Sequence, residues 1–178
     1  MDLDHFVYCV KGIMLLDSDG NRLIGKYYDN TFAGVQQEKE FERKVFNKTR
    51  KLNSDIILLD GLICVYKSSV DLYFCVIGSG QQDELILYSV LNCFYETVVH
   101  ILKKSVEKKT LYECVDMVML AIDEICDSGV ILETDYNSVL SRLAFRSDEL
   151  SFSEQTVAQV GMQVLQSARE QLKWSLLK

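Results

Sequence analysis

The sequence predicts an α+β domain in which one antiparallel sheet is packed by helices. The chain of 178 residues has an ordinary globular composition, 48% hydrophobic and 25% charged, which fits one hydrophobic core. Its apolar segments follow the order β-β-α-β-β-β-α and are followed by smaller helices. Asp-Gly pairs, which favour tight hairpin turns, stand between neighbouring strand segments at Asp19-Gly20 and Asp60-Gly61. These three observations predict the class before any single element is placed.

The first elements predicted are a hairpin and a helix. Residues 6–16 are apolar on both alternating faces, which predicts a central strand covered on both sides. Asp19-Gly20 supplies the positive φ of a tight turn, so residues 21–28 are expected to return as the partner strand. A helix is expected over residues 31–46, where apolar positions recur at helical spacing among Gln, Glu, Lys and Arg, and we expect it to lie across the sheet.

Three short apolar runs at residues 56–59, 62–67 and 72–77 predict an antiparallel meander, since turn residues separate them. A long helix is expected from Asp83 to Lys104. It is apolar nearly all round, so we expect it to be largely buried. The meander completes a five-stranded antiparallel sheet, and the long helix packs against it.

Smaller elements complete the chain. Residues 112–126 carry one apolar stripe and predict a helix, followed by an extended step at 130–133 and a short helix at 135–145. Ser151 and Glu154 stand at capping-box spacing, so the last helix is expected to begin at Ser151. We therefore expect residues 1–150 to form the domain and residues 151–178 to form a C-terminal amphipathic helix of the same unit.

Charge and hydropathy exclude several classes of protein. A formal charge of −7 and a pI near 4.9 argue against nucleic acid as the main partner, because neutralising phosphates requires a basic surface. Charged residues interrupt every apolar run that approaches the length of a membrane span. The N-terminus Met1-Asp2-Leu3-Asp4 has acids where a secretory signal carries basic residues. These features predict a cytosolic protein.

No catalytic residue, cofactor-binding residue or metal ligand is predicted. The six cysteines lie singly in apolar runs, which indicates reduced, buried thiols rather than disulfides or a zinc site. Gly78-Ser79-Gly80 superficially resembles a dinucleotide loop, but Asp83 stands at the third glycine position and would repel a pyrophosphate. Asp17-Ser18-Asp19 begins like a calcium loop, yet a hairpin turn explains it fully. An enzyme remains a minor alternative, because catalytic groups assemble in space.

Two groups of side chains are candidate partner contacts. Two basic clusters stand out in this acidic chain: Arg43, Lys44, Lys48, Arg50 and Lys51, and then Lys103, Lys104, Lys108 and Lys109. Such runs are mostly solvated faces, and the alternative is contact with an acidic partner or an anionic membrane surface. Near the C-terminus, Trp174 is flanked by Leu172, Leu176 and Leu177. This group either packs on the domain or is held out as a partner interface, since aromatic anchors are enriched there.

Several strings together identify a family. They are Asp19-Gly20-Asn21-Arg22-Leu23, Lys26-Tyr27-Tyr28-Asp29, Phe46-Asn47-Lys48-Thr49, the run from Val65 to Phe74 (VYKSSVDLYF), Gly129-Val130-Ile131-Leu132-Glu133 and Lys173-Trp174-Ser175-Leu176-Leu177. From Val10 to Lys178 the chain resembles the zeta subunits of coatomer, which are related to the small sigma chains of clathrin adaptors. The resemblance implies a longin-like (SNARE-like) fold, a five-stranded antiparallel sheet packed by helices with additional C-terminal helices.

The resemblance also implies a function. Such a chain pairs with the trunk of the gamma subunit of coatomer in the cytosolic COPI coat on Golgi membranes, which carries retrograde and intra-Golgi traffic. An ARF-class GTPase would recruit the whole complex through its larger subunits, so membrane association is peripheral. One departure is Val160-Gly161-Met162-Gln163, which lengthens the last predicted helix beyond the family pattern. The alternative is a free longin domain that regulates a SNARE or a small GTPase.

Overall fold

The computed structural model describes residues 9–50, 55–103 and 105–144. Two compact units divide the chain, Met1–Leu140 and Ser141–Lys178, and the elements named here belong to the first. In chain order they are β1 (Val10–Asp17), β2 (Arg22–Tyr27), α2 (Val35–Thr49), β3 (Ile56–Leu59), β4 (Leu62–Ser69), β5 (Leu72–Ser79), α3 (Glu84–Leu102), α4 (Lys108–Glu113), α5 (Val115–Ile125), β6 (Cys126–Asp127) and β7 (Val130–Ile131). Residues 136–144 are helical and cross the unit boundary. The predicted division at residue 150 stays a prediction.

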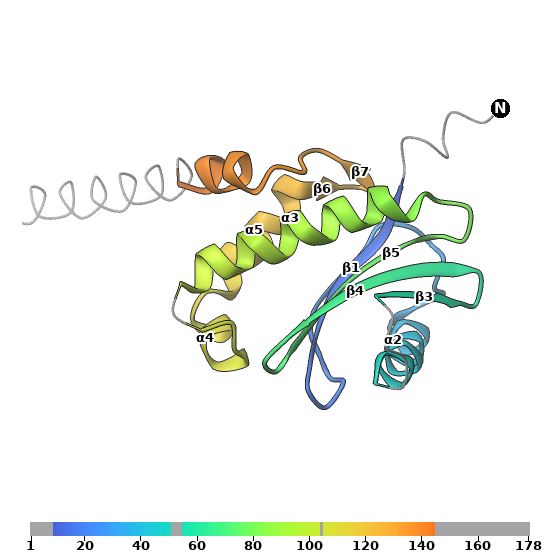
Figure 1. Cartoon of the computed structure of the whole chain (residues 1–178). Coiled ribbons are helices and arrows are strands. Elements are labelled where there is room, and N and C mark those ends of the chain that lie inside the picture. Colours follow the sequence, from blue (N-terminus) through green and yellow to red (C-terminus); the bar gives the residue numbers. More distant parts are fainter. Residues whose placement is uncertain (1–8, 51–54, 104, 145–178) are drawn as a thin grey trace, which may run out of the picture. The chain divides into compact units, whose positions relative to one another are not determined.

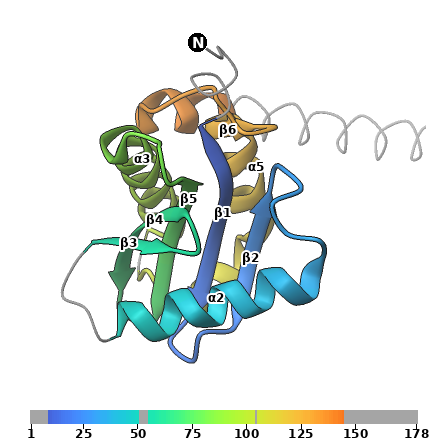
Figure 2. The same cartoon turned by 90° about the vertical axis from the view of Figure 1, so that its right-hand side faces the viewer.

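Strands β1 to β5 form one antiparallel sheet in the order β2-β1-β5-β4-β3. Helix α2 covers one face, and helices α3 and α5 cover the other (Figures 1 and 2). The five-stranded antiparallel α+β architecture expected from the sequence is therefore confirmed. Strands β1 and β5 are central, and Ile13, Met14 and Leu15 have no exposed surface. This burial on both faces explains why the β1 sequence is apolar without alternation.

The face under α2 is closed by one contiguous cluster. Its members come from β1, β3, β4, β5 and α2, and they are Met14, Leu16, Phe41, Val45, Phe46, Ile57, Leu62, Cys64, Tyr66, Cys75 and Ile77. An edge-to-face contact between the rings of Phe46 and Tyr73, 5.3 Å apart, joins α2 to β5. Such contacts add to the stabilisation from burial alone.

The opposite face packs against α3 and α5. Phe74 on β5 meets the rings of Phe94 and Tyr95 on α3 at 5.4 and 5.1 Å, both edge to face. At Gly78 a Cβ atom would lie 2.6 Å from a methyl carbon of Leu87. Glycine at this position therefore allows the close approach of α3 to β5 that fills this side of the core.

Helix α3 is the only one among the described helices that is long and apolar enough to pass a length-and-composition test for a membrane span, with a mean hydropathy of 1.5. Its packing gives a different reason for that composition. Leu87, Leu91 and Phe94 are fully buried against the sheet and α5. The helix is therefore the core helix that the sequence predicted.

The turns and caps follow the expected chemistry. Gly20 has φ of 82°, as the predicted hairpin turn requires. Ser128 and Gly129, at 50° and 85°, form the two-residue turn of the β6–β7 hairpin. Asp83 caps α3 by accepting a hydrogen bond from the backbone N–H of Leu85 at 2.9 Å. The strand before Asp83 is antiparallel to its neighbours, so the dinucleotide-loop alternative lacks the parallel βαβ unit it needs.

Two helix predictions need correction. Helix α2 begins at Val35 rather than at residue 31, because Asp29 accepts hydrogen bonds from the backbone and hydroxyl of Thr31 in a turn. The helix expected over residues 112–126 is instead two, α4 and α5, which meet at Cys114. The break accompanies contacts of Lys108 in α4 with Asp71 and Asp17.

Candidate partner-binding surface

The described residues offer little that could perform chemistry. Burial raises the pKa of Cys93 and of Cys126 to about 11, so both thiols stay protonated at neutral pH. A protonated, buried thiol is neither a nucleophile nor a metal ligand. No group of His, Cys, Asp and Glu suited to a metal ion occurs within residues 9–50, 55–103 and 105–144.

A buried carboxylate locks the β1–β2 hairpin to α4. Asp17 is 1% exposed, and its oxygens accept hydrogen bonds from the backbone N–H groups of Asp19 and Asn21 at 3.0 and 2.8 Å. The ammonium of Lys108 lies 2.7 Å from the same carboxylate. The backbone N–H of Lys108 donates to Asp71 in the β4–β5 turn at 3.0 Å. One residue of α4 thus fastens two hairpins together.

These donors determine the charge state of Asp17. Burial alone would raise its pKa, but the hydrogen bonds from Lys108, Asn21 and Asp19 outweigh burial and lower the pKa to about 2. The Asp17 oxygens, which resembled calcium ligands in the sequence, are therefore already occupied by protein donors. Sequence reasoning missed this role, since the partner Lys108 lies 91 residues away along the chain.

A second buried carboxylate joins α2 to the edge strand β2. Glu42 is 2% exposed, and it accepts a hydrogen bond from the Tyr27 hydroxyl and an ion pair from Arg22, each at 2.7 Å. Arg22 also pairs with Glu38 at 2.9 Å. Burial, together with the nearby Glu42 carboxylate, raises the pKa of Tyr27 well above its usual range. This end of the molecule is held by a paired network rather than by exposed charge.

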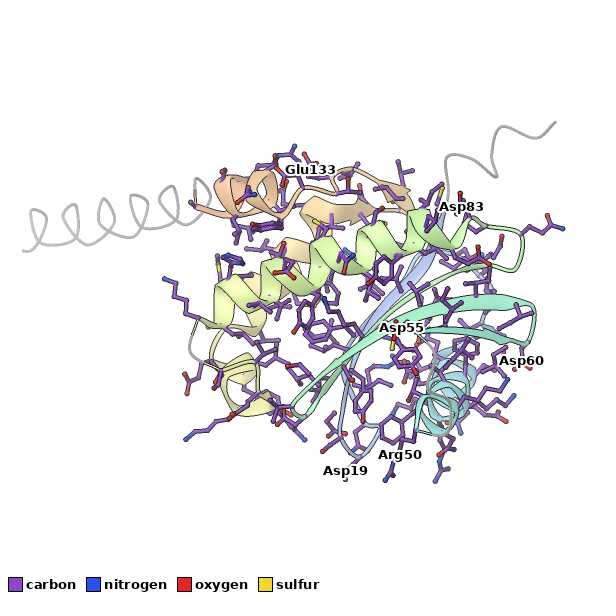
Figure 3. All side chains as sticks on the ribbon, in the orientation of Figure 1. Asp19, Arg50, Asp55, Asp60, Asp83 and Glu133 are labelled. Atoms are coloured by element: carbon purple, nitrogen blue, oxygen red, sulfur yellow. The ribbon has the colours of Figure 1, made fainter. Side chains whose placement is uncertain are left out.

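The first basic cluster lies on α2 and just after it. Lys44 pairs with Asp60 at 3.1 Å, and Lys48 donates to the carbonyl of Leu58 at 3.2 Å. Arg43 and Arg50 are exposed, and Arg50 lies over the ring of Phe46 at 5.8 Å. Lys51 lies outside the described residues. The cluster is therefore partly engaged in internal contacts and partly directed to solvent (Figure 3 labels Arg50).

The second basic cluster is divided. Lys103 is the C-cap residue of α3, where a cation complements the helix macrodipole. Lys108 is paired with the buried Asp17. Of the residues in this basic cluster, it is therefore the least available to a partner. Lys109 lies in α4, and Lys104 falls outside the described residues.

A shallow hollow of about 270 Å³ lies between α2, the segment before it and the β3–β4 turn. Its lining residues are Thr31, Phe32, Gln37, Glu40, Phe41, Lys44, Asp60 and Leu62. The lining mixes polar and aromatic groups, and Lys44 and Asp60 within it are paired with each other. The predicted interface residues Leu172, Trp174, Leu176 and Leu177, and the extension at Val160 to Gln163, lie outside the described residues.

Comparison with known proteins identifies the family of this chain. The sequence model of the clathrin adaptor complex small chain matches residues 9–150. The chain belongs to this family. Among curated small chains of this kind, the chain is 51% identical over 99% of its length to human coatomer subunit zeta-1, covering 97% of that protein. It is 44% identical to Arabidopsis thaliana coatomer subunit zeta-2, over 94% of this chain and 95% of that protein.

The small-chain fold also recurs at low sequence identity. One chain in a homology model of the full-length AP-3 complex in a stretched open conformation matches with a TM-score of 0.62 at 16% identity, covering 83% of this chain and 98% of that chain. At this identity the match concerns the fold alone. The resemblance to zeta subunits and adaptor small chains inferred from sequence strings is confirmed by these comparisons.

The contacts of Asp17 with Lys108, Asp19 and Asn21, which we call the hairpin lock, are expected to stabilise the fold. Because the pKa of Asp17 is lowered on folding, its contribution is present above about pH 4 and is lost as the pH falls towards about 2. Asp17→Asn is expected to lower the free energy of unfolding by about 2 kcal/mol at pH 7, and this difference should narrow below pH ~4. Denaturant unfolding curves across this pH range measure it. Asp19→Asn, in the same turn but exposed, is the control and should change little; an equal loss in both variants would contradict the lock.

Proposed function

We propose that this chain is a non-catalytic structural subunit of the COPI vesicle coat, acting in Golgi-to-ER retrograde and intra-Golgi transport. The observation that carries the proposal is the 51% identity to human coatomer subunit zeta-1 along 99% of the chain. Buried, protonated thiols and carboxylates held in structural ion pairs support a role without catalysis or cofactor. The net charge of −7 fits a protein partner rather than nucleic acid.

The partner in this proposal is the gamma subunit of coatomer, and through it the remaining coat subunits. Protein interfaces of a stable assembly bury apolar and aromatic anchors, and Leu172, Trp174, Leu176 and Leu177 supply such a group. An ARF-class GTPase acts on the assembly only indirectly, through the larger subunits. The location proposed is the cytosolic face of Golgi membranes and COPI-coated vesicles, with peripheral attachment through the complex.

The basic cluster of α2 adds a contact with an anionic surface to this proposal. Arg43 and Arg50 are exposed and stand seven positions apart, which is close to two helical turns. Within the described residues, neither makes an ion pair. Each basic residue near an anionic membrane strengthens attachment, so this face could meet the Golgi surface when the coat assembles.

Affinity purification of the tagged chain from cytosol at physiological salt tests the coat proposal. Stoichiometric recovery of a gamma-type large subunit with the other coat subunits is expected, and mass spectrometry identifies them. Trp174→Ala combined with Leu176→Ala should reduce this recovery about tenfold, because truncating aromatic and aliphatic anchors removes most binding energy. Ser175→Ala, between them in sequence, is the control. Recovery of a SNARE or small GTPase without coat subunits would favour the free longin alternative.

Flotation with phosphatidylserine vesicles tests the basic cluster. Arg43→Gln with Arg50→Gln should weaken binding of the purified coat assembly about tenfold at low salt. Gln36→Glu with Gln81→Glu changes the net charge equally at exposed positions outside the cluster and should weaken it less. Equal effects of the two pairs would mean that overall charge, and not this face, governs attachment.

A further inference from the structure

Helix α4 is short and has few attachments to the rest of the domain. It has six residues, fewer than an isolated helix needs to persist in water. Within residues 105–113 only Leu111 is buried, at 1% exposure, while Tyr112 is 59% exposed. The position of this segment therefore depends on a small number of contacts.

The polar attachments of this segment come from one residue. Lys108 donates its backbone N–H to Asp71 and its ammonium to Asp17, at the turn ends of two hairpins beside α4 (Figure 1). Among the described residues, Lys108 is the only member of 105–113 with a hydrogen bond or ion pair to an element other than α4 and α5. One polar residue and one apolar side chain therefore hold the segment in place.

The backbone departs from helical geometry on both sides of α4. Lys103, which follows α3, has a φ of 53°, a value that L side chains rarely adopt. Cys114 separates α4 from α5 with a φ of −130° and a ψ of 21°, outside the helical range. Residues at the ends of elements absorb the dihedral changes when a segment moves. Both ends of α4 therefore have a residue at which the chain can pivot.

We propose that residues 105–113, which we call the α4 strap, open and close as a unit while the five-stranded sheet stays folded. The contact of Lys108 with Asp17 holds the strap closed, and Leu111 packs again when the strap closes. Opening returns the Asp17 carboxylate to water and uncovers the surface beneath Leu111. A surface at this end of the sheet thus becomes accessible without global unfolding. This property goes beyond the proposed coat function and does not depend on it.

Hydrogen exchange of the full chain, followed by NMR at urea concentrations below the unfolding transition, tests the strap. The amides of Leu111 and Cys114 report on it, because they donate to the carbonyls of Glu107 and Leu111 at 3.0 and 3.1 Å. These amides are expected to exchange about tenfold or more faster than those of β1 and β5. Their exchange should also depend only weakly on urea, since opening exposes little surface. Exchange at the rate and with the urea dependence of β1 and β5 would overturn the proposal.

Matched variants separate the strap from the stability of the whole domain. Lys108→Met removes the ammonium that pairs with Asp17 and should speed exchange of the Leu111 amide about tenfold. Lys109→Met removes the same charge at an exposed position of α4 and should change that rate less than about twofold. Val45→Ala, in the core under α2, should speed exchange in β1 and β5 about tenfold and leave the Leu111 amide within about twofold. An equal response of the Leu111 amide to Val45→Ala, or no response to Lys108→Met, would overturn the strap.

Discussion

The structure depends on covering both faces of one antiparallel sheet. The central strands β1 and β5 are apolar on both sides, and Ile13, Met14, Phe74 and Cys75 have no exposed surface. A single helical layer would leave one of these faces in water, at a cost of roughly 25 cal/mol for each Å² of apolar surface. Helix α2 on one side, and α3 with α5 on the other, meet this requirement (Figure 1). The surfaces that remain for partners are the outer faces of these helices and the sheet edges.

Two buried carboxylates fix how the layers meet. Glu42 ties α2 to Arg22 and Tyr27 of β2, while Asp17 ties the β1–β2 hairpin to Lys108 of α4. Each has charged and neutral donors in place, as a carboxylate removed from water requires. Both carboxylates therefore serve the packing of the domain.

The sequence predicted what local chemistry decides and missed what distant contacts decide. The succession of strands and helices along the chain, the turn at Gly20 and the cap at Asp83 follow from backbone preferences and from apolar periodicity between near neighbours in sequence. The late start of α2 had a local signal, the Asp29–Thr31 turn, that apolar periodicity does not register. The break at Cys114 accompanies contacts of Lys108 with Asp17 and Asp71, which lie 91 and 37 residues away along the chain. No periodicity reveals a pairing across such separations. The sequence shows the basic clusters as groups of Lys and Arg. Only the structure distinguishes Lys44, which pairs with Asp60, from the exposed Arg43.

The central claim is that the chain acts through a preformed surface that a large coat subunit covers. Hydrogen exchange of the free chain and of its complex with that subunit tests this claim most directly. The account predicts slow exchange in β1, β5 and α3 in both states, because the core forms without a partner, and new protection at outer helix faces or sheet edges only in the complex. Protection that is the same in both states, or a sheet that becomes protected only in the complex, would contradict it.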